Sequence, residues 1–202
     1  MLSYQTIEPH TLELLKALMA EPLFEGLRLV GGTSLALQYG HRSSVDIDLF
    51  GSIVAEDEDI SNALRNHGKL TIRKESPNIH IYELDDVKVD IVNYSYAWID
   101  DAVMEDGIVL ASPKDIAAMK INAVEGRGTK KDFIDVNELL KHYSLEDILH
   151  FYSEKYPEYS EYRALLSLSY FDDAEMQPMP KMFIADTWNQ VKQNIKMAIK
   201  DL

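Results

Sequence analysis

Two aspartates alternate with apolar residues in VDIDLF (residues 45–50). Val, Ile and Phe favour a β-strand and Asp is disfavoured in one, so Asp46 and Asp48 carry a local cost that a function would explain. Residues two apart in a strand project from the same face, and these two carboxylates therefore share a face. Because adjacent carboxylates repel each other unless a cation lies between them, the pattern predicts a site for Mg²⁺ or Mn²⁺, which prefer oxygen ligands.

A third carboxylate stands in VKVDIVNY (residues 87–94), where Asp90 interrupts an apolar run. An antiparallel neighbouring strand would bring Asp90 within reach of Asp46 and Asp48. Three carboxylates around two metal positions suit phosphoryl transfer, in which one metal activates the attacking hydroxyl and the other holds the triphosphate. In the alternative interpretation Asp90 faces solvent on a half-exposed hairpin, where alternation alone predicts a polar residue.

The glycines of LVGGTS (residues 29–34) follow a short predicted strand and precede a predicted helix. Without a Cβ atom, Gly31 and Gly32 let the backbone approach a phosphate, and a helix beginning at Thr33 directs free N–H groups at it. Thr33 or Ser34 adds a hydroxyl donor. A glycine pair alone is more often a tight turn, but a glycine pair followed by a helix and Asp-x-Asp predicts a nucleotide site.

Basic residues gather in residues 113–131, which makes this segment the best candidate to meet an anionic ligand. They are Lys114, Lys120, Arg127, Lys130 and Lys131. Lys120 interrupts the apolar run DIAAMKINAV (residues 115–124), and a lone cation among apolar residues needs an anionic partner. Arg127, between two glycines, suits either a phosphate contact or an exposed loop.

The polar residues around that segment also have structural interpretations. Thr129 and Asp132 have the spacing of a capping box, and Lys131 stands four residues before Asp135, as in a helical ion pair. The dipeptide HR (residues 41–42) lies in the loop before Asp46, where it could approach a substrate; we interpret it as part of a solvated loop.

The composition is that of a soluble globular protein, with 202 residues, 46% hydrophobic and 27% charged. There is no cysteine, which suits a reducing compartment. No apolar stretch approaches the roughly 20 residues of a membrane span, and the first residues do not resemble a signal peptide, so we expect a cytoplasmic protein without membrane contact. The net charge of −14 argues against a broad nucleic-acid-binding face.

The predicted elements change in kind near residue 112. Before it, short strands are expected at 27–30, 45–50, 69–75 and 107–111, a helix at 33–40, and a hairpin that turns at Asp85-Asp86. After Pro113, helical spacing covers residues 114–125, 130–142, 145–155, 158–168 and 185–200. We therefore expect an α+β fold with an α/β domain over residues 1–112 and a helical domain over residues 113–202.

Two long segments resemble a known family. GGTSLALQYGHRSSVDIDLF (residues 31–50) is similar to the first motif of the AbiEii/AbiGii nucleotidyltransferase toxins of bacterial type IV toxin–antitoxin and abortive-infection systems. SPKDIAAMKINAVEGRGTKKDFIDVNELL (residues 112–140) is similar to their later block. The resemblance spans about residues 27–142 and implies a polymerase-beta-like nucleotidyltransferase fold, with a small mixed sheet followed by a helical region.

The resemblance also implies roles for single residues. It makes Asp46 and Asp48 metal ligands, with Asp90 as the third, and Lys120 a catalytic contact to phosphate. The implied nucleotide-binding residues are Gly31, Gly32, Thr33, Ser34, Arg127, Lys131, Asp132 and Asp135.

The implied activity is magnesium-dependent transfer of a nucleoside monophosphate from a nucleoside triphosphate to an acceptor, which is tRNA for some members. The implied partner is a cognate antitoxin. Two alternatives stay open: a non-catalytic nucleotide-binding regulatory protein, and a nucleotidyltransferase acting on a small molecule such as an aminoglycoside. The acidic chain favours both over tRNA modification, because an enzyme acting on tRNA normally gains affinity from phosphate contacts.

Overall fold

The computed structural model describes the whole chain, residues 1–202, which forms two compact units. The first unit comprises Met1–Gln38, Ser44–Ser95 and Ala102–Ala111, and the second comprises Tyr39–Ser43, Tyr96–Asp101 and Ser112–Leu202. All strands lie in the first unit, and helices α4 to α9 lie in the second. Two short segments that precede residue 112 therefore belong to the helical unit.

The first unit is built on a seven-stranded mixed sheet of order β3-β4-β5-β2-β1-β7-β6. Its strands are β1 (Leu27–Leu29), β2 (Ile47–Gly51), β3 (Leu70–Lys74), β4 (Ile79–Leu84), β5 (Val87–Asn93), β6 (Val103–Glu105) and β7 (Ile108–Leu110). β1 pairs antiparallel with β2 and parallel with β7. The predicted small mixed sheet is confirmed, although β6 was not expected.

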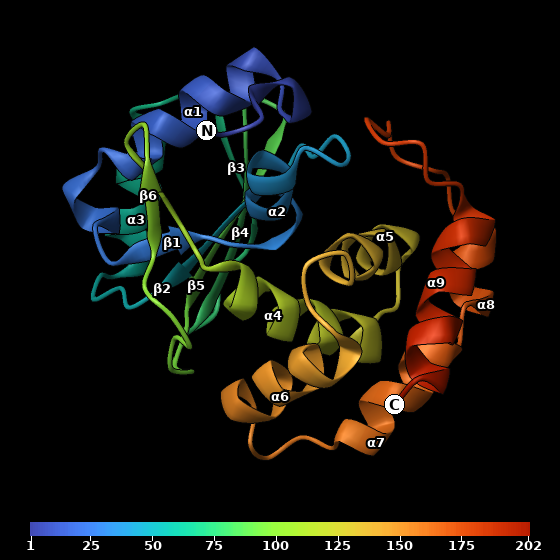
Figure 1. Cartoon of the computed structure of the whole chain (residues 1–202). Helices are drawn as coiled ribbons and strands as arrows, with labels where there is room; N and C mark the ends of the chain where they lie inside the picture. The colour runs from blue at the N-terminus through green and yellow to red at the C-terminus, as the bar shows by residue number, and fades with distance from the viewer. The chain divides into compact units, whose positions relative to one another are not determined.

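Three helices accompany this sheet (Figure 1): α1 (Pro9–Met19), α2 (Gly31–Tyr39) and α3 (Asp57–Arg65), with single 3₁₀ turns at Tyr4–Thr6 and Pro22–Phe24. α1 and α3 share one buried apolar cluster with alternate residues of the central strands. Members of this cluster are Leu15, Leu18, Ile60, Leu64, Ile47, Leu49, Val89 and Ile91. Because side chains alternate along a strand, Asp48 and Asp90 project from the opposite face of the sheet.

β2 and β5 run parallel, which corrects the antiparallel pairing expected for Asp90. After β2 the chain forms α3 and then the antiparallel run β3, β4 and β5, and this run ends with β5 beside β2 in the same direction. Local sequence patterns do not encode that order.

The second unit is helical, with α4 (Pro113–Gly126), α5 (Lys130–Leu139), α6 (Leu145–Lys155), α7 (Glu161–Ser169), α8 (Asp172–Glu175) and α9 (Trp188–Lys200). α4 packs against α5, α6 and α7, and α9 packs against α5 and α7. Capping boxes begin α5, α6 and α9, and the one predicted from Thr129 and Asp132 is confirmed. No helix in the chain combines the length and apolar character that a membrane crossing requires.

α2 begins at Gly31, two residues earlier than predicted. Gly31 has a φ of +70°, a conformation that glycine adopts without strain. The amide of Ser34 donates to the carbonyl of Val30 at 3.4 Å and closes the first turn. The glycine pair therefore forms the N-terminus of the helix and is not a separate loop before it.

The predicted hairpin turn at Asp85-Asp86 is confirmed, and both residues have positive φ angles, of 47° and 66°. A two-residue turn of this kind suits the twist of the paired strands.

We expect Asp86→Val to lower the free energy of unfolding by roughly 1–2 kcal/mol, because a branched Cβ is strained in this conformation. Asp86→Gly should be no less stable than the original. Urea unfolding of both variants, with the same dependence of the free energy on urea concentration, tests this prediction. Equal stability of the Val and Gly variants would contradict the left-handed conformation of Asp86.

Candidate active site on the sheet

Asp48 and Asp90 lie side by side on adjacent parallel strands. They are register partners of β2 and β5, so their Cα atoms lie about 5 Å apart. Both side chains are half-buried. Asp46, also half-buried, directly precedes β2 and has the same parity as Asp48. Asp48 and Asp90, which are widely separated in sequence, are therefore neighbours on the sheet face opposite α1 and α3.

Gly31 brings the N-terminus of α2 against the carboxylate of Asp48. A Cβ atom added at Gly31 would lie 2.4 Å from Oδ2 of Asp48, so no other residue fits without displacing the acid. The amide of Val30 donates to the carbonyl of Asp48 at 2.9 Å. The N–H groups in the first turn of a helix lack intrahelical partners, and in α2 this turn contains Gly31 and Gly32. The glycine motif and the Asp-x-Asp motif thus meet in one place.

The hydroxyls of Thr33 and Ser34 bind within the protein. Thr33 Oγ1 donates to the backbone carbonyl of Asp46 and lies 2.9 Å from Oγ of Ser44. Oγ of Ser34 accepts from the amide nitrogen of the Gln38 side chain at 3.2 Å. Both residues are buried. Thr33 thereby ties α2 to the residue before β2, whereas Ser34 binds within α2. The predicted contact of both hydroxyls with a triphosphate stays a prediction.

Asp90 has one paired and one unpaired carboxylate oxygen. Nζ of Lys88 lies 2.5 Å from Oδ2. Oδ1 is buried and has no hydrogen-bond partner. A buried carboxylate oxygen without a donor is costly, and a bound cation would satisfy it.

The structure holds no group of three or more His, Cys, Asp or Glu side chains arranged to bind one metal ion. Mg²⁺ is commonly held by one or two carboxylates, with water and substrate phosphates completing its octahedron. Asp48 and Asp90 supply two such carboxylates, and the unpaired oxygen of Asp90 is a suitable ligand. The residues present therefore fit a divalent ion bound together with a nucleotide.

The second unit contains a buried ion cluster around Asp135. Both oxygens of Asp135 accept from Arg42, with Nε and Nη2 each at 2.7 Å. Nε2 of His41 lies 2.7 Å from Oδ1, and Nζ of Lys120 lies 2.6 Å from Oδ2. All four side chains are buried. The solvated loop expected for residues 41–42 is therefore wrong, and so is the Lys131 pairing expected for Asp135, whose partners are His41, Arg42 and Lys120.

Asp132 extends the cluster. It accepts from Lys120 at 3.1 Å and from Nε and Nη2 of Arg127, each at 2.9 Å. Lys120 thus has two carboxylate partners, which confirms that this lone cation needs an anionic partner. Its predicted contact with phosphate, and those of Asp132 and Asp135 with nucleotide, stay predictions. Lys131 is exposed on α5.

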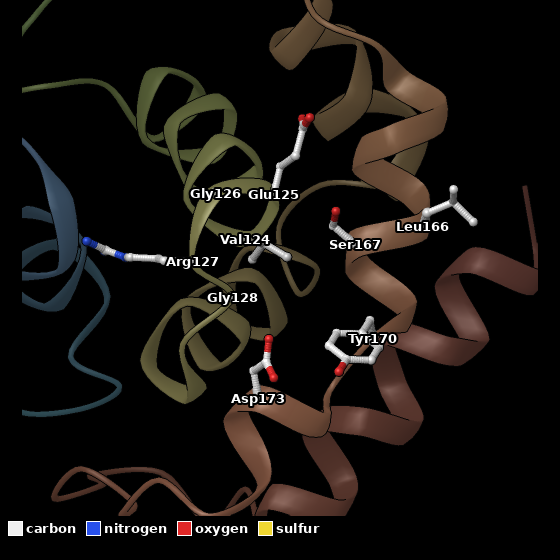
Figure 2. A pocket seen from close by; sticks show the side chains of 9 residues that line it. All are labelled: Val124, Glu125, Gly126, Arg127, Gly128, Leu166, Ser167, Tyr170 and Asp173. Atoms are coloured by element: carbon white, nitrogen blue, oxygen red, sulfur yellow. The ribbon is translucent and has the colours of Figure 1, made fainter.

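Arg127 also stands at the edge of a cavity of about 410 Å³ within the second unit. The cavity is lined by the end of α4 and by residues of α7 and α8 (Figure 2), and its polar side chains include Glu125, Ser167 and Asp173. In Figure 2 the guanidinium of Arg127 extends away from the other labelled side chains. Its phosphate role stays a prediction, while its ion pair with Asp132 is part of the cluster.

The cluster lowers the pKa values of both aspartates. Burial alone would raise the pKa of Asp135, but the charges of Arg42 and Lys120 hold it well below its usual value. Burial likewise opposes ionisation of Asp132, and Lys120 and Arg127 lower the pKa of that carboxyl. Both aspartates are therefore ionised and paired at neutral pH.

With this geometry in place, comparison with known proteins decides the family. The model of the family described as "Nucleotidyl transferase AbiEii toxin, Type IV TA system" matches residues 13–201. The chain belongs to this family. It is therefore a nucleotidyltransferase, and membership implies a nucleoside triphosphate substrate and an antitoxin partner.

Relatives of this AbiEii chain include aq_aa25 of Aquifex aeolicus (strain VF5), which is 32% identical over 180 residues, or 86% of each chain. The crystal structure of JHP933 from Helicobacter pylori is similar with a TM-score of 0.55 and 17% identity, and it covers 97% of this chain and 94% of its own. A second crystal structure from H. pylori has a TM-score of 0.56 and 18% identity, and it covers 96% of this chain and 97% of its own. These two structures have the same fold as this chain, which confirms the predicted α+β nucleotidyltransferase fold.

Gly31→Ala should destabilise the AbiEii chain more than a positive φ alone explains. Gly107 is a matched control, because its φ is +80° and an added Cβ would meet no atom within 4 Å. We expect Gly107→Ala to lower the free energy of unfolding by about 1–2 kcal/mol and Gly31→Ala by about 1–3 kcal/mol more, because Asp48 must move. Chemical unfolding of both variants measures the difference, and equal losses would argue against the close approach.

The buried cluster should make stability depend on pH at the acid end. The pKa values of Asp132 and Asp135 are lower in the folded than in the unfolded chain, so their stabilisation is complete above about pH 5 and is lost as pH falls below about 4. Asp135→Asn should lower the free energy of unfolding at pH 7 by about 3–5 kcal/mol, because it leaves buried cations without their partner, and should flatten the acid dependence. Glu154→Gln, at an exposed position of α6, should change neither. An unaltered acid profile in Asp135→Asn would contradict this account.

Proposed function

We propose that this chain is a Mg²⁺- or Mn²⁺-dependent enzyme that transfers a nucleoside monophosphate from a nucleoside triphosphate to an acceptor hydroxyl. The single observation that carries the proposal is the approach of the Gly31 backbone to Asp48, which is itself the register partner of Asp90. A helix N-terminus, a bare backbone and two carboxylates then face the same space. This combination suits a metal-bound polyphosphate.

In this proposal Asp48 and Asp90 bind the divalent ion, and Asp46 adds a third carboxylate from the same face. When bound, the ion would neutralise phosphate charge and lower the pKa of the acceptor hydroxyl. The N–H groups of Gly31 and Gly32 hold the β- and γ-phosphates, with the dipole of α2 favouring negative charge there. The acceptor hydroxyl gives up its proton to water as its oxygen forms a bond to the α-phosphorus. The bond from this phosphorus to the oxygen that bridges to the β-phosphorus breaks, and pyrophosphate leaves.

For the acceptor we propose a hydroxyl of tRNA, which rests on the resemblance to the family. A second candidate is a cationic small molecule such as an aminoglycoside, which the net charge of −14 favours. A cognate antitoxin would oppose the activity in the cell. We expect the enzyme to act in the cytoplasm, where triphosphates, tRNA and Mg²⁺ occur together.

Transfer of label from an α-³²P-labelled nucleoside triphosphate to tRNA or to an aminoglycoside tests the activity. Label should appear in one acceptor with Mg²⁺ and not with EDTA. Asp48→Asn should reduce the rate by at least about a hundredfold, because charge developing on the phosphates loses its counter-ion. Asp59→Asn, an exposed acid on α3 of the same unit, should retain the original rate. Label transfer at full rate in Asp48→Asn would reject the proposed site, and the acceptor that receives the label decides between the two candidates.

A further inference from the structure

Charged side chains form a row on the sheet face opposite α1 and α3, and Lys88 lies in it. Lys88 and Asp90 are two residues apart on β5 and project from the same face. On β4, Glu83 is the register partner of Lys88. Glu83 in turn accepts from Arg73 of β3 through its Oε2. Lys88 therefore stands between two carboxylates, of which Asp90 is its partner in this structure.

The Lys88 ammonium forms an ion pair with Asp90. It contacts Oδ2 at 2.5 Å and leaves Oδ1 buried and unpaired. The Lys88 side chain is 47% exposed, whereas that of Asp90 is only 18% exposed. A cation that approaches Asp90 therefore meets a flexible, half-exposed ammonium at the carboxylate that it would bind.

We propose that Lys88 is a built-in counter-ion that competes with a divalent ion for Asp90 and thereby sets the metal affinity of the site. The inference rests on the metal site of the proposed function. Lys88 touches neither nucleotide nor reacting atoms in this proposal, so it is a positioning residue and acts through Asp90.

The structure also provides a position for the displaced lysine. Residues directly opposite on antiparallel strands have Cβ atoms about 5 Å apart, so the long Lys88 side chain reaches Glu83 as readily as Asp90. Exposed ion pairs contribute little stability, and the exchange of one carboxylate for another is therefore easily reversed. Metal binding at Asp90 would move Lys88 toward Glu83 without leaving either charge unpaired.

Binding of Mn²⁺ alone, measured from the loss of the free-ion EPR signal, tests the proposal without reference to activity. Lys88→Met should bind Mn²⁺ roughly tenfold more tightly than the original chain, because it removes a like charge a few ångströms from the ion. Lys88→Arg keeps the charge and should bind as the original does. Lys74→Met is the matched control: Lys74 is an exposed lysine on β3 of the same unit, paired in register with Ile81. It should also bind as the original does.

A double variant shows whether the gain passes through Asp90. Lys88→Met combined with Asp90→Asn should bind Mn²⁺ no more tightly than Asp90→Asn alone. An unchanged affinity in Lys88→Met, an equal gain in Lys74→Met, or a gain that persists without Asp90 would each overturn the proposal. Far-UV circular dichroism confirms that each variant is folded.

The same titration separates this proposal from the one on which it rests. If the original chain binds Mn²⁺, Asp48→Asn abolishes the binding and Lys88→Met leaves it unchanged, only the role of Lys88 is rejected. If neither the original chain nor Lys88→Met binds Mn²⁺, the metal site and the role of Lys88 both fail. Binding seen only in Lys88→Met supports competition in its strongest form.

Discussion

The carboxylate of Asp48 and the N-terminus of α2 occupy adjoining positions because residue 31 has no side chain. Antiparallel pairing of Leu29 with Leu49 sets the end of β1 beside β2, and the amide of Val30 then binds the carbonyl of Asp48. A helix N-terminus attracts anions, so it would accept either the carboxylate or a phosphate. Both anions can share the place only if a cation lies between them. The proposed metal requirement follows from this crowding of negative charge.

In the helical unit, by contrast, the buried acids have cationic side chains of the protein as partners. Asp132 and Asp135 are buried, but Arg42, Lys120 and Arg127 satisfy them within the unit. Such clusters gain little net stability over apolar packing, while the loss of one member leaves an uncompensated charge. A second buried pair follows the same rule: Nζ of Lys155 lies 2.7 Å from Asp115 and 4.6 Å from the centre of the Trp98 ring. These ion pairs join segments that are distant in sequence: Arg42 to α5, and α6 to α4.

Local sequence patterns predicted much of the fold, because strands, turns and helix caps are determined by residues that are close in sequence. The alternation of VDIDLF, the turn at Asp85-Asp86 and the capping box at Thr129 each follow from backbone geometry within a few residues. The parallel pairing of β2 and β5 does not, since it depends on the path of the chain through α3, β3 and β4. The contacts that join the glycine turn to Asp48 were expected from the motif, but the metal and nucleotide roles of these residues stay predictions.

The main error concerned His41 and Arg42, which we expected in solvent. A polar dipeptide in a loop is usually hydrated, and the partner that buries it, Asp135, lies 93 residues further along the chain than Arg42. The available signal was Asp135 itself, which stands between Ile134 and Val136, because an acid buried among apolar residues needs a cation. A search for distant basic partners would have found Arg42 only among many candidates.

The division of the chain into units has a consequence for how the protein can be cut. Tyr39–Ser43 and Tyr96–Asp101 belong to the helical unit, although both stand among elements of the sheet. A fragment that starts at Ser112 would keep Asp135 and Asp115 but lose Arg42 and the backbone amide of Ile99, which binds Asp115 at 2.9 Å. Such a piece would keep Lys120 beside Asp135 and Lys155 beside Asp115, but each buried acid would lose hydrogen bonds that it has in the whole chain. We therefore expect the helices to be less stable in a fragment that starts at Ser112 than in the whole chain. The two units are distinct in their contacts, but the segments that form them alternate along the chain.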